Sequence, residues 1–188
     1  MQKIIFTAHC LLNTASKVVL FQEGEMAAEA ALRRRFLSEA IARGVQLVQL
    51  PCPEFTLYGA RRWGHVSDQF DNPFFRDHCR RLLRPFLLQL REYLRFPERF
   101  LVVGIVGIDG SPSCGVDYTS RGEWHGSFGG RQDLGEVLAT ARLAAGRGVF
   151  MDEVGRMLAE EGLAEVVPVV SLYAREPEKC LGLLGGDA

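Results

Sequence analysis

The chain has 188 residues, enough for one domain with a sizeable core, and we expect no second full domain. Its 22 basic and 23 acidic residues leave a formal net charge of -1, which gives no electrostatic footprint for nucleic acid or an anionic membrane. No apolar run approaches the length of a membrane span and no signal-peptide pattern is present, so we expect a cytoplasmic protein. In the cytoplasm, clustered cysteines more often bind metal or react than form disulfides, and this chain has five.

Three strand-like stretches each lead into a cysteine. Runs of apolar and β-branched residues, typical of strands buried in a sheet, occupy residues 3–9, 45–50 and 100–108. The first run is followed by Cys10, the second by Pro51 and Cys52, and the third by a hydroxyl-rich loop containing Cys114. A fourth run at residues 166–170 contains Pro168, which indicates a sheet edge or a bulge.

Helical patterns lie between these strands. Residues 24–43 predict a helix that stops at Gly44, with an apolar face formed by Met26, Ala30, Leu37 and Ile41. Asn72 and Pro73 are typical of a helix start, and the apolar stripe that follows comprises Phe75, Cys79, Leu82, Phe86 and Leu90. Pro85 interrupts this pattern and predicts a kink or a restart. Further helices are predicted at residues 133–145 and 150–161.

This alternation of strands and helices predicts a single α/β domain over residues 1–188. We expect one open, mostly parallel sheet of about four or five strands in the order 2-1-3-4, flanked by helices in a Rossmann-like three-layer arrangement. Residues 116–131 are rich in glycine and polar side chains and are predicted to form a lid or binding loop. Residues 171–188 are predicted to be a C-terminal tail, in which Cys180 has no assigned role.

The predicted strand order brings three cysteines together. Ligands of open parallel sheets bind outside the carboxyl ends of the strands, where Cys10, Cys52 and Cys114 would converge. Thiolates select zinc, copper(I) or iron–sulfur clusters, and three ligands with one open position are typical of a reactive metal site. From spacing alone, an iron–sulfur cluster and a catalytic zinc ion with His9 or His65 nearby both remain possible.

The residues around these cysteines resemble a known family. Cys10-Leu-Leu-Asn, Cys52-Pro-Glu and Ser111-Pro-Ser-Cys-Gly are similar, in order and context, to the three signature motifs of the thiouracil desulfurase family. The resemblance runs from the first strand to about Gly115 and continues more weakly through residues 148–170. It implies a small α/β protein.

The resemblance also implies a cofactor, a 4Fe–4S cluster held by Cys10, Cys52 and Cys114. The iron without a protein ligand would act as a Lewis acid and accept sulfur from a thiolated small molecule. A C=S group would then become C=O with release of sulfide and no net redox change. We therefore expect a desulfidase, a hydrolase or lyase by reaction type, whose partner is a small-molecule substrate.

Four further residues take roles under this resemblance. By position, Glu54 is the candidate that relays protons, although capping a helix or pairing with Arg61 is an alternative role for its carboxylate. Ser111 and Ser113 would hydrogen-bond the substrate or the cluster sulfurs, or stabilise a turn. Gly115, which has no side chain, would let its backbone N–H approach the cluster.

The chain departs from the family pattern directly after the first motif. Well-known members of the family have a second cysteine and an Arg-Tyr pair where this chain has Ala15, Ser16 and Lys17, so the motif match covers the ligands and leaves the substrate open. A flat heterocycle would suit the aromatic side chains of the loops, which include Trp63, Trp124 and His125.

Two other functions fit the same residues. In the first, Cys114 is the nucleophile of a hydrolase or amidotransferase, which requires a base within hydrogen-bond reach, and His125 is the candidate nearest in sequence. In the second, the protein is a non-enzymatic sensor in which a cluster or a zinc ion shapes a surface for a partner.

Overall fold

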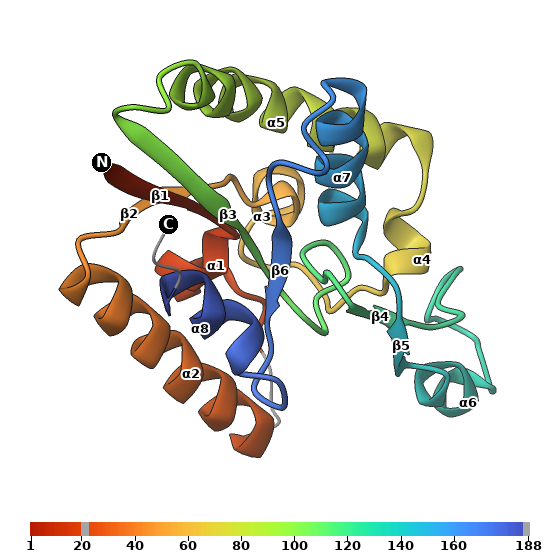
Figure 1. Ribbon diagram of the computed structural model, residues 1–188. Coiled ribbons are helices and arrows are strands. Elements are labelled where there is room, and N and C mark those ends of the chain that lie inside the picture. The colour runs from red at the N-terminus through yellow and green to blue at the C-terminus, as the bar shows by residue number, and fades with distance from the viewer. Residues whose placement is uncertain (20–22, 186–188) are drawn as a thin grey trace.

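The computed structural model describes residues 1–19 and 23–185 and has an α/β fold (Figure 1). Its main sheet has four parallel strands in the order β2-β1-β3-β6: β2 (Gln46–Gln49), β1 (Gln2–Thr7), β3 (Phe100–Ile108) and β6 (Val169–Leu172). This is the predicted order 2-1-3-4, and both the fold class and the sheet topology are confirmed. The central strand β3 pairs with β1 on one side and β6 on the other, which explains its unbroken apolar sequence.

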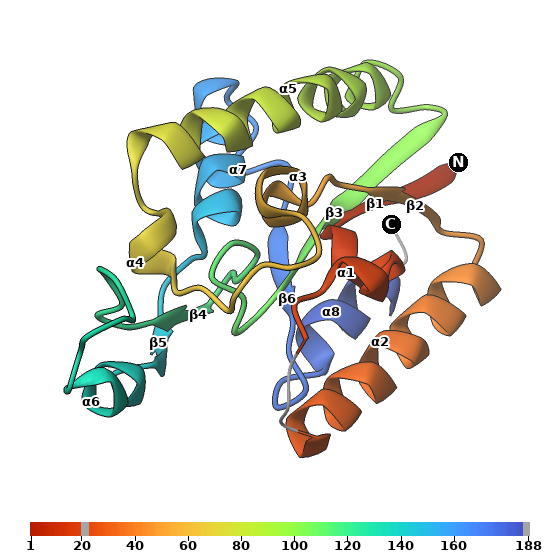
Figure 2. The same ribbon diagram turned by 180° about the vertical axis from the view of Figure 1, so that it is seen from behind.

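Helices cover both faces of this sheet (Figures 1 and 2). The long helix α5 (Pro73–Leu94) lies on one face together with α7 (Val149–Glu160). On the other face, α2 (Glu23–Ala42) packs with α8 (Glu178–Gly185). The largest fully buried side chains are Phe6, Phe36, Phe70 and Phe150, so the core fills both spaces between sheet and helices.

The start of α5 follows the sequence prediction, whereas its middle does not show a restart. The Asn72 side chain accepts hydrogen bonds from the backbone N–H groups of Phe74 (3.1 Å) and Phe75 (3.0 Å), and Pro73 is at the first helical position. The helix continues through Pro85. Because Pro85 is exposed, the carbonyl that loses its helical partner there can be hydrated.

The packed face of α2 differs from the predicted one. Met26 and Ile41 are 41% and 72% exposed, whereas Leu32, Phe36 and Ala40 are buried against the sheet. This helix has no dominant apolar stripe, so periodicity does not select a face. The aromatic ring of Phe36 does, because it removes more apolar surface from water than an aliphatic side chain.

Residues 116–145 contain a small second sheet that was not predicted. Strand β4 (Tyr118–Arg121) pairs antiparallel with β5 (Arg142–Ala145), and the intervening helix α6 (Leu134–Ala139) is shorter than expected. The first part of the predicted lid is therefore a strand, and the predicted helix at 133–145 is wrong beyond Ala139. Pairing with β4 outweighs the helix propensity of residues 142–145. A lid function for the remaining loop stays a prediction.

The carboxyl-terminal segment is not a simple tail. After β6, helix α8 packs against α2 and the sheet, and Cys180 on this helix is fully buried. Four short helices complete the described fold: α1 (His9–Leu12), the 3₁₀ helix η1 (Thr14–Ser16), α3 (Pro53–Tyr58) and α4 (Ser67–Phe70).

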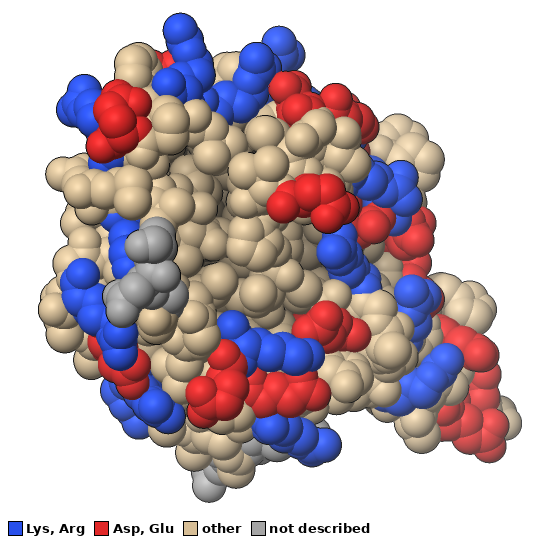
Figure 3. All heavy atoms as spheres, viewed as in Figure 1, with Lys and Arg blue, Asp and Glu red and all other residues tan. Residues whose placement is uncertain are grey.

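Acidic and basic side chains are mixed on the face of the molecule that Figure 3 shows, around an uncharged central area. This interspersion agrees with the formal net charge of -1. Within residues 1–19 and 23–185, no helix combines the length and the apolar character needed to cross a bilayer.

Candidate functional site

The three motif cysteines lie at the carboxyl ends of three adjacent strands. Cys10 is in α1, directly after β1; Cys52 follows β2; and Cys114 is in the loop after β3. The thiols of Cys10 and Cys52 are near enough for each to shift the pKa of the other, and Cys114 interacts electrostatically with both. Segments separated by more than 40 residues thus bring their thiols to one place. Figure 2 shows α1, which contains Cys10, beside α3, which begins directly after Cys52.

Cys52 has the most acidic of these thiols. Its sulfur caps α3 by accepting a hydrogen bond from the backbone N–H of Phe55 at 3.4 Å, and Pro53 occupies the first helical position. The neighbouring Cys10 thiol, assisted by the Phe55 N–H, lowers the pKa of Cys52 to about 7. The interaction with Cys52, together with burial, raises the pKa of Cys10, so Cys52 is the first of the pair to ionise.

Cys114 lies in a loop of residues 109–115 that hydrogen bonds hold from both ends. The Asp109 carboxylate accepts from the backbone N–H groups of Val116 (2.8 Å) and Asp117 (3.0 Å), and the Ser111 hydroxyl accepts from the Cys114 N–H (3.0 Å). Burial raises the pKa of the Cys114 thiol to about 12. From the sequence, Asp109 has no assigned role. Its position as an acidic residue at the end of a buried strand is the sequence feature that could have indicated one.

The amino terminus of α7 also holds this loop. The N–H of Val149 donates to the Pro112 carbonyl (3.1 Å), and the Ser113 carbonyl accepts from the N–H groups of Phe150 (2.9 Å) and Met151 (3.1 Å). These are helix-terminal donors without partners inside the helix. Gly148 packs so closely that a Cβ there would lie 2.5 Å from the Ser113 carbonyl carbon.

Gly115 has a structural role that differs from the predicted one. Its N–H donates to the Ser111 carbonyl at 3.1 Å, so this group belongs to the turn and is not free to approach a cluster. A Cβ at this position would lie 2.1 Å from the Tyr118 carbonyl oxygen. Glycine is therefore required by the close approach of two backbone segments.

Glu54 and the two motif serines form a buried hydrogen-bonded group beside Cys114. The Ser113 hydroxyl donates to Glu54 Oε1 at 2.6 Å and lies 3.5 Å from the Cys114 sulfur. Because Ser113 gives its proton to Glu54, the Ser111 hydroxyl is the donor in the 3.4 Å contact between the serines. Glu54 and Ser113 are 7% and 1% exposed. Two of the predicted catalytic residues are thus in direct contact.

Arg62 is the residue of this group that the sequence did not identify. Its Nε donates to Glu54 Oε2 at 3.2 Å, and its side chain is only 3% exposed. From the sequence, Arg61 is the candidate partner of Glu54, and Arg62 has no assigned role. Two neighbouring arginines in a loop have no pattern that distinguishes them, so only the tertiary structure assigns the ion pair to Arg62.

The contacts of the aromatic and histidine candidates are with residues other than the three cysteines. Trp63 is 75% exposed and contacts Phe128 edge to face at 5.9 Å, and His125 is exposed and contacts the Glu123 carbonyl. His9 is half-buried and contacts the Leu50 carbonyl at 3.3 Å. His65 stacks on Tyr58 at 5.0 Å, and burial lowers its pKa.

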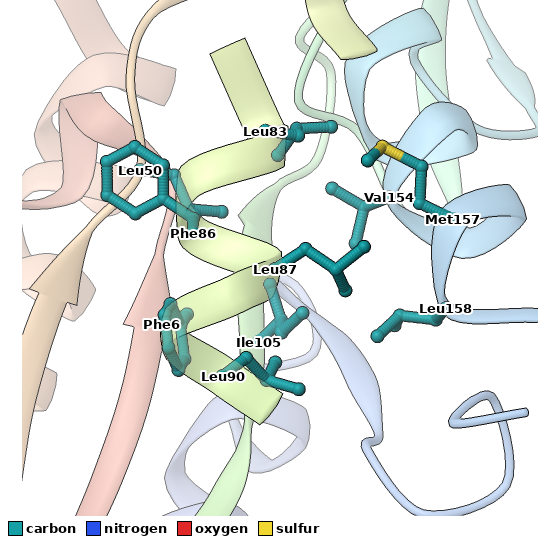
Figure 4. Close-up of a pocket in the computed structure, with 10 residues that line it drawn as sticks. All are labelled: Phe6, Leu50, Leu83, Phe86, Leu87, Leu90, Ile105, Val154, Met157 and Leu158. Carbon is teal, nitrogen blue, oxygen red and sulfur yellow. The ribbon is translucent and has the colours of Figure 1, made fainter. Parts of the chain in front are cut away.

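Two cavities in the structure are separate from the cysteines. One, of about 30 Å³, is an apolar gap beneath α5 and α7 whose lining includes Leu83, Leu87 and Met157 (Figure 4). The other, of about 280 Å³, is polar and is lined by Ser67, Asp71, Arg76, Arg121, Arg147, Val149 and Asp152. Arg76 and Arg121 are already paired with carboxylates, so this second cavity is a surface ion-pair network.

The cysteines fit a soft, positively charged group by their chemistry. Among the described residues, no three His, Cys, Asp or Glu side chains meet the geometry of a site for a single metal ion. Cys10 and Cys114 have raised pKa values because burial and neighbouring thiols disfavour a second and third negative charge. A bound cationic centre would compensate that repulsion and allow all three thiols to ionise.

One curated relative is uncharacterised. It is the protein MJ0003 of Methanocaldococcus jannaschii, which is 29% identical over 121 residues, covering 64% of this chain and 72% of the relative. No family model matches the chain, and no solved structure matches it.

Proposed function

We propose that this protein is an iron–sulfur-dependent desulfidase that converts the C=S group of a nucleobase-like small molecule to C=O. The overall reaction consumes one water and releases hydrogen sulfide, and no electron donor or acceptor is needed. The proposal is carried by one observation: the thiols of Cys10, Cys52 and Cys114 interact with one another, and the Glu54–Ser113 hydrogen bond lies beside Cys114.

The proposed cofactor is a 4Fe–4S cluster with Cys10, Cys52 and Cys114 as its ligands. When bound, it would supply a Lewis-acidic iron with an open position for the substrate sulfur. Zinc is the alternative metal.

The side chains around the cluster would then transfer protons to and from the attacking water and the departing sulfide. In this proposal, the carboxylate of Glu54 takes a proton from the attacking water and returns it to the departing sulfide. The Ser113 hydroxyl orients that carboxylate through its 2.6 Å hydrogen bond. The Ser111 hydroxyl supports the loop that presents the Cys114 sulfur, because it accepts the Cys114 N–H.

A hydrolase that uses Cys114 as nucleophile has less support. In residues 1–19 and 23–185, the Cys114 thiol has its side-chain hydrogen bond with Ser113, and none of the histidine contacts reaches it. The raised pKa of Cys114 also disfavours the thiolate in the metal-free protein.

The test begins with anaerobic reconstitution using iron and sulfide. We expect a brown protein with a broad visible absorption, bound iron and acid-labile sulfide, and sulfide release from a panel of thiolated nucleobases that includes 2-thiouracil. The Cys52→Ser and Cys114→Ser variants should lose most of their iron. Cys180→Ser is the matched control, because Cys180 is a buried cysteine outside the site and its Sγ donates to the Pro177 carbonyl (3.3 Å), a bond that serine retains.

The outcomes separate the candidate functions. A colourless protein without iron after anaerobic reconstitution contradicts the proposal. Full iron occupancy without turnover of any thiolated compound favours the sensor function.

A further inference from the structure

The Arg62 side chain contacts two segments of the site, at Glu54 and at Ser16, and also the Gly59 carbonyl in its own loop. In addition to its bond with Glu54, its Nη2 donates to the Ser16 carbonyl at 2.6 Å and its Nη1 donates to the Gly59 carbonyl at 3.2 Å. The side chain is 3% exposed, so water does not compete for these bonds. A guanidinium offers five donors in a rigid plane, which lets one side chain serve three acceptors in different directions.

These contacts connect the segments that carry all three cysteines. Ser16 ends the short helical connection that begins with Cys10, through α1 and η1. Glu54 follows Cys52 by two residues, and its second oxygen accepts from Ser113, which precedes Cys114. A continuous path of hydrogen bonds therefore runs from Ser16 through Arg62 and Glu54 to Ser113.

Two other contacts join the Cys10 and Cys52 segments, because Gln49 Nε2 donates to the His9 carbonyl (2.9 Å) and His9 Nδ1 contacts the Leu50 carbonyl (3.3 Å), but neither includes the Cys114 loop. The sheet fixes the strand ends, but Cys10 lies in a four-residue helix and Cys114 in a loop, which are elements with little intrinsic stability. Removing Arg62 would leave the buried charge of Glu54 without compensation. We therefore expect both segments that Arg62 contacts, at Ser16 and at Glu54, to be displaced.

We propose that Arg62 is the positioning residue of the cysteine centre. It holds the segments that carry Cys10, Cys52 and Cys114 in one arrangement and orients Glu54 toward Ser113. Only its effect on turnover rests on the proposed desulfidase function, because the arrangement of the thiols exists in the metal-free protein as well.

The experiment uses the full chain with Arg62 replaced by Met or Lys. Methionine keeps the unbranched, apolar stem and removes every donor, whereas lysine keeps the charge and loses the planar fork. Arg61→Met is the matched control, since Arg61 is the adjacent arginine and is exposed. Two quantities are measured: the alkylation rate of each cysteine in the metal-free protein, resolved by peptide mass spectrometry, and the iron bound after reconstitution.

We expect Arg62→Met to accelerate alkylation of Cys52 and Cys114 by about ten-fold or more, because local opening exposes buried thiols. Arg62→Lys should show a smaller acceleration, and Arg61→Met should match the unmodified protein. Cys180 is fully buried in α8 and reports on global unfolding. Its rate should not change in a variant that affects only the site, and the bound iron should fall in the same order as the alkylation rates rise.

Unchanged alkylation of Cys52 and Cys114 in Arg62→Met overturns the proposal. An equal acceleration of Cys180 in both variants also overturns it, because Arg62 would then support the whole fold. If Arg62→Met does not fold, Arg62→Lys decides on the same criterion. If the unmodified protein binds no iron, the proposed function fails, while the alkylation pattern still decides the role of Arg62.

Discussion

Ser113 contacts the Glu54 carboxylate, the Ser111 hydroxyl and the Cys114 thiol. Its hydroxyl donates to Glu54, accepts from Ser111 and lies within contact of the Cys114 sulfur, while its carbonyl caps α7. The side chain and the backbone of one residue thus belong to different hydrogen-bond networks. Replacing the side chain tests the first network and leaves the second intact.

Ser113→Ala is expected to lower turnover of a thiolated substrate by about 100-fold, because Glu54 loses the donor that orients it. The bound iron should fall much less than the turnover, since Ser113 is not a proposed ligand and its carbonyl still accepts the α7 hydrogen bonds that hold the Cys114 loop. The measurement is kcat together with iron content after anaerobic reconstitution. Ser127→Ala, in an exposed loop, is the control. Turnover equal to that of the unmodified protein would remove Ser113 from the proposed mechanism.

Among the elements, helix α7 holds the loop of residues 109–115, which contains Cys114. Helix α7 begins against the carbonyls of Pro112 and Ser113, and Gly148 provides the close approach that lets these bonds form. The loop and the helix therefore act as one unit, although residues 116–147 separate them in sequence.

Gly148→Ala is expected to destabilise the protein and displace the Cys114 loop, because the new Cβ would meet backbone atoms at 2.5 Å, 2.7 Å and 2.9 Å. Both the midpoint of thermal unfolding and the bound iron should fall. Gly182→Ala is the control: no atom lies within 4 Å of its Cβ, and alanine in a helix interior is favoured over glycine by about 0.5–1 kcal/mol. Equal stability of the two variants would show that the loop tolerates displacement.

In the molecule as a whole, the buried carboxylate of Glu153 joins α7 to α5, the two helices that cover one face of the sheet. Glu153 on α7 is 2% exposed and pairs with Arg76 at 2.6 Å and Arg80 at 3.1 Å, both on α5. Helix α7 also holds the cysteine loop, so these ion pairs connect the outer layer of the fold to the site.

Glu153→Gln is expected to lower the free energy of unfolding by about 2 kcal/mol, because two charge-assisted hydrogen bonds are weakened in a buried position. Urea denaturation of the metal-free protein measures this change. Glu160→Gln is the matched control, since Glu160 pairs with Arg80 but its side chain is 57% exposed, and it should have little effect. A similar loss in both variants would mean that burial does not strengthen the Glu153 pairs.

Several features of this molecule were predictable from local sequence. The apolar runs that end at Cys10, Cys52 and before Cys114 identified three strands, and the alternation with helices predicted both the parallel sheet and its order. Asn72 and Gly44 marked helix ends correctly, because caps depend on the residue at one position and on its immediate neighbours.

Other features depend on contacts between distant segments. Nothing in residues 142–145 predicts a strand, since they become one only by pairing with β4, and the apolar periodicity of α2 does not select the face that contains Phe36. The difference between Arg61 and Arg62 is of the same kind, because the two residues have the same chemistry and only one meets Glu54 and Ser16.

The sequence by itself therefore determined the fold class, the strand order and the three cysteines that follow the strands, because periodicity and strand ends are local properties. Only the tertiary structure decided which side chains surround those cysteines. Burial, ion pairing and backbone approach, as at Arg62, Ser113 and Gly148, arise when distant segments pack, and no local pattern encodes them.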